Sequence, residues 1–386
     1  MLFRHRLFVI AFLFCYCSIA LFYDFRVLSA RRVISGFSIE SFFLFWAAIL
    51  VPFISFLILK IPFDKRLNSF IIFYAVYVIW SLMIGVISQN EVASILGDFY
   101  KSLFIPAGLG LYNLTKNNTS KFYESAAKIL ILYATLRLLT FLYLGTPINR
   151  IYYGTVYDVL MFGFIGIFLS ERKRLDAKKV LPNFFYSFYP LVIVLLGQKK
   201  LVILSLIGFL PARLKARNLW LPVILIGFLS LYWKDVLSFV STTRLSAFLN
   251  YEEIFYGESR RIAEVKACLN AWQENISSFF LGHGFGSDIF VYSEKEAYSI
   301  EVHSIHNSTF ATIFRSGIIG LFVILMFLTK LLSSIISDSG QKNVAATMLA
   351  ALIACQFAYG FMDQVFVGYL FAHLKLGNPR FSTKSF

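Results

Sequence analysis

The chain of 386 residues contains few charged side chains. Only 15% of its residues are Asp, Glu, Lys or Arg, whereas 58% are apolar, and the mean hydropathy is +0.72. A soluble domain has about 25% charged and about 45–50% apolar residues. The shortage of charge, together with 44 Phe and 21 Tyr, excludes a soluble enzyme, a disordered chain and a disulfide-stapled secreted module. The composition predicts an all-α protein that crosses a membrane many times.

Cysteines and metal-ligand patterns are scarce as well. The four cysteines, Cys15, Cys17, Cys268 and Cys355, are scattered, and the sequence has neither a CxxC pair nor a paired DxD-type acidic motif. Three of these cysteines lie in apolar segments, which predicts that they are small buried hydrophobic residues. We therefore expect neither a metal nor a cofactor.

Apolar windows of the length needed to span a bilayer, about 20 residues, recur along the chain. The first follows the basic start Arg4-His5-Arg6 and differs from a signal peptide because it lacks a small-residue cleavage site. The stretch Val344–Leu376 is too long for one span and is predicted to form two, interrupted at Gly360 and Asp363. About twelve spans are predicted: Leu7–Tyr23, Phe37–Leu59, Ser69–Ile87, Ile95–Leu114, Tyr123–Leu144, Tyr153–Leu169, Val180–Leu196, Leu201–Leu210, Leu219–Trp233, Asn307–Leu332 and the two parts of Val344–Leu376.

The distribution of basic residues predicts the orientation of these spans. With a cytoplasmic N-terminus, twenty Lys and Arg fall in cytoplasmic segments and six in short outer loops. Both termini are therefore expected in the cytoplasm. The net charge of +15 does not indicate nucleic-acid binding, because its cations do not gather on one soluble domain.

One connection is much longer than the others. Residues 1–233 would hold nine spans, residues 234–305 a large periplasmic loop, and residues 306–386 the last three spans and a cytoplasmic tail. Ser259 is predicted to cap a helix in this loop, with a stripe of Ile262, Val265, Leu269 and Trp272. A structured outer loop among short connections is where we expect the functional site.

Cations gather near the expected outer face, where the orientation rule would not place them. Those near the ends of spans are Lys101, Arg137, Lys199, Lys200 and Arg315, and those in outer loops are Arg150, Arg244, Arg260 and Arg261. They predict a pocket for an anionic headgroup such as a lipid-linked phosphate or pyrophosphate. The alternative is interfacial snorkelling of each side chain. Asp98 and Asp158 are predicted to be structural, with Asp98 and Lys101 forming an i, i+3 charge pair.

A glycine-rich run and three histidines follow within the same loop. The run Gly282-His283-Gly284-Phe285-Gly286 allows close backbone approach and predicts N–H groups directed toward an anion. His303 and His306 lie three residues apart and could act as general bases, since histidine titrates near neutral pH. A zinc site at these two histidines is conceivable, but a third and a fourth ligand at normal spacing are lacking. The alternative for His306 is that it caps a helix that starts at Asn307.

These segments resemble the O-antigen ligase and polymerase superfamily. His306-Asn307, nine further residues and Gly317-Ile318-Ile319-Gly320 are similar to its H-[NSQ]-x9-G-x-x-G pattern. The segment Ser259-Arg260 to Trp272 and the run Gly282–Gly286 resemble the other family segments, in the same order. The family usually has Ser-Arg where this chain has Lys199-Lys200, and often an acid where this chain has Arg315. The resemblance covers residues 259–321.

The resemblance implies an integral-membrane glycosyltransferase of GT-C type that needs no metal. Its donor would be a glycan on undecaprenyl pyrophosphate. Arg260 and His306 would be catalytic, as the cation that stabilises the leaving pyrophosphate and as the general base. The residues expected to bind pyrophosphate or glycan are Lys199, Lys200, Arg261, His303, His283, Gly284, Asn307 and Arg315.

Three functions remain open on the sequence. The preferred one is an O-antigen polymerase, which joins the glycan to a hydroxyl of another lipid-linked repeat unit. The preference follows the Lys199-Lys200 departure and the short, Phe-rich chain. A ligase, which transfers the glycan to lipid A–core, needs the same donor site, and a polysaccharide transporter or flippase would share the spans. We expect a bacterial inner membrane location, with the lipid-linked glycan, membrane lipids and a chain-length regulator protein as partners.

Overall fold

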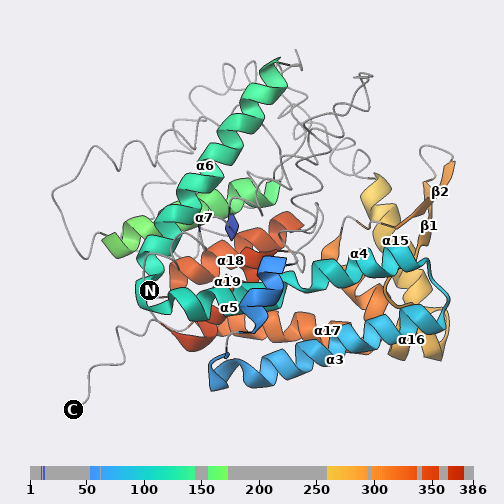
Figure 1. The fold of residues 1–386 in the computed structure, drawn as a ribbon. Coiled ribbons are helices and arrows are strands. Elements are labelled where there is room, and N and C mark those ends of the chain that lie inside the picture. The colour runs from blue at the N-terminus through green and yellow to red at the C-terminus, as the bar shows by residue number, and fades with distance from the viewer. Residues whose placement is uncertain are drawn as a thin grey trace.

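The computed structural model of the chain is mostly helical (Figure 1). It describes residues 10, 12–13, 53–60, 62–143, 155–172, 259–293, 298–303, 305, 307–336, 341–355 and 364–377. The predicted spans Val180–Leu196, Leu201–Leu210 and Leu219–Trp233 lie outside the described residues, as does nearly all of the first span.

Two long apolar helices, α3 (Asn68–Ile87) and α17 (Ser308–Ile336), pack against each other and run the length of the described bundle (Figure 1). The segments Lys65–Ile87 and Ser308–Ile336 have the length and composition needed to cross a membrane. One face of α3 leaves Ile72, Val76, Ile79 and Met83 exposed at helical spacing. An apolar stripe of this kind is what a lipid-facing helix presents, so the fold is compatible with a membrane protein.

The expected single span Ile95–Leu114 is wrong, because the structure divides it at Leu103 into α4 (Val92–Ser102) and α5 (Phe104–Thr115). Pro106 explains the division, since proline has no N–H to donate to the carbonyl four residues earlier. That carbonyl belongs to Ser102, and it accepts a hydrogen bond of 3.0 Å from the Tyr74 hydroxyl instead. Because of this break, α4 can lie against the elements of the predicted outer loop, which are described below (Figure 1).

The remaining apolar helices follow the predicted order. Helices α6 (Thr119–Tyr143) and α7 (Thr155–Arg172) pack together, and α7 packs on α18 (Lys342–Cys355). The predicted division of Val344–Leu376 is confirmed, since α19 (Val365–Leu376) is a separate helix. Gly360 and Asp363, the expected interruption, lie outside the described residues. Short 3-10 turns, η1 (Lys65–Leu67) and η2 (Lys116–Asn118), precede α3 and α6.

The described residues of the predicted outer loop form two helices and a hairpin at one end of the bundle (Figure 1). Helix α15 (Ser259–Gln273) begins where the sequence predicts, followed by α16 (Ile276–Leu281). The antiparallel strands β1 (Ile289–Ser293) and β2 (Tyr298–Val302), paired from Ile289 with Val302 to Ser293 with Tyr298, were not expected in an all-helical loop.

A second hydrophobic core joins these outer elements to α17. It contains Cys268 of α15, Ile289 and Val291 of β1, and Phe314 of α17. The buried face of α15 therefore differs from the predicted stripe, of which Val265, Leu269 and Trp272 are half-buried. Burial raises the pKa of the Cys268 thiol to about 12, and the thiol stays protonated and unreactive at neutral pH.

Glycines bring α5 and α19 into backbone contact. A Cβ at Gly108 of α5 would collide with the backbone of Val365 and Tyr369, and one at Gly368 of α19 would collide with that of Ile105. Small residues permit such close helix packing where lipid supplies no hydrophobic driving force between helices. The two glycines therefore set the distance between α5 and α19.

We predict that Gly108→Ala lowers the free energy of unfolding by about 1–3 kcal/mol, because the two helices must separate to admit the methyl group. The matched control is Gly97→Ala on α4, where an added Cβ has no neighbour within 4 Å. This control should be neutral or stabilising by about 0.4–1 kcal/mol. Chemical unfolding of the detergent-solubilised protein measures both. Equal effects of the two substitutions would contradict the proposed contact.

Candidate functional site

The Gly282–Gly286 turn lies between α17, α3 and α4. The N–H groups of residues 283–286 are all donated within the protein: His283 N to Phe314 O (3.0 Å), Gly284 N to Arg315 O (2.8 Å), Phe285 N to Ser81 O (2.8 Å) and Gly286 N to the Asp98 carboxylate (2.9 Å). The sequence predicted that these groups face an anion. In the structure that anion is the protein's own Asp98, and the other three groups meet main-chain carbonyls.

Two glycines make this close approach possible. Gly284 has a φ of 79°, and a Cβ at this position would collide with the backbone of Gly85 on α3. Gly317 has a φ of 60° and interrupts the helical geometry of α17, where a Cβ would collide with the carbonyl of Phe280. Both φ values lie in the left-handed region that glycine adopts without steric cost. The kink at Gly317 therefore admits the end of α16 and the start of the turn.

Asn90 holds the turn from the other side. Its Nδ2 donates to His283 O (3.0 Å) and to Phe285 O (2.8 Å), from the connection between α3 and α4. Asn90 was not singled out from the sequence. Its role depends on two segments nearly two hundred positions apart in the chain.

The centre of the site is the carboxylate of Asp98 on α4, whose side chain is 1% exposed. Arg315 Nη1 lies 2.9 Å from Oδ1 as an ion pair without hydrogen-bond alignment. Lys101 Nζ lies 3.6 Å and His303 Nε2 3.7 Å from the same oxygen. The predicted pair of Asp98 and Lys101 is confirmed, and the structure adds two further cationic or titratable partners.

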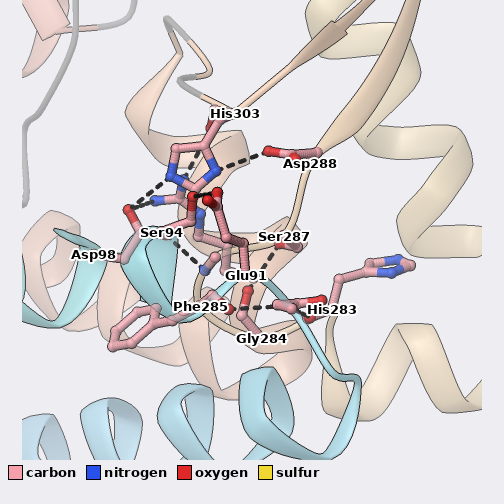
Figure 2. A network of polar contacts seen from close by, with 12 residues as sticks. Glu91, Ser94, Asp98, His283, Gly284, Phe285, Ser287, Asp288 and His303 are labelled. Atoms are coloured by element: carbon pink, nitrogen blue, oxygen red, sulfur yellow. Dashed lines mark hydrogen bonds and ion pairs between the residues drawn. The ribbon is translucent and has the colours of Figure 1, made fainter. Parts of the chain in front are cut away.

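His303 connects the two carboxylates of the site. Its Nδ1 lies 2.8 Å from Asp288 Oδ1, while its Nε2 faces Asp98, as Figure 2 shows. The carbonyl of His303 accepts a hydrogen bond of 3.0 Å from Arg315 Nη2. Since Asp288 immediately precedes β1 and His303 immediately follows β2, their contact closes the base of the hairpin. Asp288 was missed because its only sequence signal is its place beside a hairpin that was not predicted.

Two further predicted site residues, His283 and Asn307, make contacts within the fold. His283 stacks on Phe314 with ring centroids 4.5 Å apart, and its Nε2 lies 3.1 Å from Ala271 O. Asn307 is buried, and its Oδ1 accepts from Phe310 N at 3.2 Å. Asn307 thus caps α17, which starts at Ser308, in agreement with the predicted position of this helix start to one residue.

Several predicted site residues are not placed. His306, Lys199 and Lys200 lie outside the described residues. Arg260 and Arg261 lie in the first turn of α15, but their side chains are not among those described. Of the predicted set, the structure therefore brings together His303, Arg315, His283, Gly284 and Asn307. Asp98 lies with them. In the sequence it stood out only because of its i, i+3 spacing from Lys101.

Comparisons with known proteins add no assignment. The chain matches no protein family, no curated protein and no solved structure. Within the described residues, no group of three His, Cys, Asp or Glu side chains is arranged to hold a metal ion.

We predict that Asn90→Ala loosens the turn and lowers its local stability by about 1–3 kcal/mol, because two partly buried carbonyls lose their donor. Asn90→Asp should be at least as harmful, since a carboxylate cannot donate to a carbonyl. Hydrogen exchange of the His283–Gly286 amides measures the effect. Asn270→Ala on the exposed side of α15 is the control. Unchanged protection in both Asn90 variants would show that Asn90 does not hold the turn.

Proposed function

We propose that the chain is a polymerase of O-antigen, or of a related surface polysaccharide, in the bacterial inner membrane. It transfers a glycan from undecaprenyl pyrophosphate to a sugar hydroxyl of another lipid-linked repeat unit. In this proposal the chain is a GT-C-like protein with about twelve spans and cytoplasmic termini, and its site faces the periplasm. Its partners are the lipid-linked glycan, membrane lipids and a chain-length regulator protein.

The observation that carries the proposal is the contact between the Gly282–Gly286 turn and the kink at Gly317. These are two separate parts of the pattern by which the sequence resembles the superfamily. A Cβ at Gly282 would collide with Arg315 and Gly317, and one at Gly317 with Phe280 and Gly282. Helix α15, which carries the third part, packs on α17 as well. A shared spatial site is what a common reaction would require of these segments.

In the proposed reaction the acceptor hydroxyl gives its proton to His306 as its oxygen bonds to the anomeric carbon. The bond between that carbon and the pyrophosphate oxygen breaks, and undecaprenyl pyrophosphate leaves. Arg260, with Lys199 or Lys200, stabilises the charge of the leaving group. Arg261 and Asn307 contribute to binding of the pyrophosphate or glycan beside them. No metal and no cofactor takes part in the proposed reaction.

The described charges favour an enzyme over a transporter. Transporters place their substrate-binding charges near the bilayer midplane. Lys101, His303 and Arg315 instead gather around Asp98 beside the β1–β2 hairpin, since His303 directly follows β2. This placement suits transfer between two lipid-linked substrates at the membrane surface.

We predict that His306→Ala and Arg260→Ala each lower glycan transfer by about a hundredfold or more, because one removes the base and the other a charge on the leaving group. The assay uses purified protein in vesicles with undecaprenyl-pyrophosphate-linked repeat units, and the products are resolved by mass. Lys266→Ala, an exposed cation further along α15, is the control and should retain activity. Full activity in both catalytic variants would refute the proposed roles.

We predict that loss of the gene leaves lipopolysaccharide core with a single repeat unit, because transfer to core continues while polymerisation stops. Electrophoresis of lipopolysaccharide from the deletion strain shows this pattern, and restoring the gene is the control. Long chains retained on the lipid carrier would instead identify a ligase. Normal chain lengths on core would contradict both functions.

A further inference from the structure

The Asp98 carboxylate on α4 joins its own helix to three segments from a distant part of the chain. Its partners are Lys101 on its own helix, Gly286 in the turn, His303 after β2 and Arg315 on α17. We infer that Asp98 is a positioning residue for the proposed glycan transfer, which holds the segment before α17 in place through His303 and Arg315. This inference rests on the proposed function and adds a residue from outside the large loop to the site.

Residues 303–307, which include His306, connect β2 to α17. At one end, His303 Nε2 faces Asp98 and its carbonyl accepts from Arg315 Nη2. At the other end, the Asn307 side chain caps α17 by accepting from Phe310 N. The segment is therefore held at both ends by described contacts. A general base must lie within hydrogen-bond distance of its proton donor, so anchoring this segment matters for catalysis.

The guanidinium of Arg315 has two partners within the protein. Its Nη1 lies against Asp98 and its Nη2 donates to the carbonyl of His303. Its side chain is only 13% exposed, so these groups face the protein interior. A guanidinium already balanced by a buried carboxylate is a poor ligand for a diphosphate. We therefore assign Arg315 a positioning role together with Asp98, in place of direct contact with the pyrophosphate.

The energetics of a buried ion pair support the same role for Asp98. Removing one partner of a buried ion pair leaves an uncompensated charge in the interior, whereas removing both charges is far less harmful. Asp98 is 1% exposed, and Lys101, 35% exposed, can turn to solvent when the carboxylate is lost. Removing the charges of Asp98 and Arg315 together should therefore lower stability by less than the sum of the two single losses. This non-additivity would identify the ion pair.

The test compares Asp98→Asn, Arg315→Gln and the double variant in the full-length protein. Asn at position 98 keeps an oxygen that can accept from Gly286 N, so the turn retains its anchor while the charge is lost. The matched control is the same cycle on the exposed pair Glu124 and Lys128 of α6, using Glu124→Gln and Lys128→Gln. Thermal unfolding, hydrogen exchange of β2 and residues 303–307, and kcat and KM for the lipid-linked repeat unit are measured.

We expect each single variant to lower kcat about tenfold to a hundredfold with little change in KM, because the base is misplaced while the donor still binds. Each should unfold several degrees lower and exchange faster at residues 303–307. The double variant should recover part of the loss in both stability and kcat. The control cycle on α6 should leave all three measurements unchanged, since exposed pairs contribute little.

Two results would overturn the inference. A higher KM with unchanged kcat in Arg315→Gln, or a lower KM in Asp98→Asn, would mean that Arg315 binds the pyrophosphate directly. Additive losses of stability with unchanged exchange at residues 303–307 would mean that Asp98 does not hold this segment. If the wild-type protein transfers no glycan, the proposed function fails, while unfolding and hydrogen exchange still decide whether Asp98 holds the segment.

Discussion

The close approach of main chain to main chain at the Gly282–Gly286 turn is the constraint on which this end of the described bundle depends. The turn enters between α17 and α3, where a side chain at Gly284 or Gly317 would collide with backbone. Its N–H groups then reach carbonyls of α17 and α3 and the carboxylate of Asp98. A turn displaced by the width of a methyl group would lose these hydrogen bonds together. The hairpin and the start of α17, which are tied to the same contacts, depend on this geometry.

Electrostatics acts on the geometry that the turn establishes. A carboxylate as buried as Asp98 is stable when cations and donors surround it, because desolvation of an unpaired charge is costly. Arg315, Lys101 and His303 meet this need from three segments of the chain. The cations that the sequence suggested as an anion pocket are thus partly arranged around an internal anion. Those left to meet a pyrophosphate in the proposed reaction include Arg260, Arg261 and the lysines at positions 199 and 200.

Sequence patterns predicted the helices whose position is set by nearby residues. The apolar windows placed α3, α6 and α17 within a few residues, and Ser259 marked the start of α15. Asp98 and Lys101 were paired correctly because an i, i+3 spacing on one helix fixes their distance. The break before Pro106 was missed because the apolar run continues through it, and its stability needs the distant Tyr74 hydroxyl. The hairpin was missed because its strands are short and pair through a register that no local pattern specifies.

The sequence by itself predicted a membrane protein, and it determined the order of the described apolar helices and the glycine and histidine segments that define the proposed site, since each follows from composition or short-range spacing. Tertiary structure alone decided what those segments contact. It turned the N–H groups of the turn inward, joined His303 to both Asp98 and Asp288, and set Arg315 against a buried carboxylate. The physical reason is that a buried polar group must find its partner wherever packing brings one, and here the partners come from segments far apart in the chain.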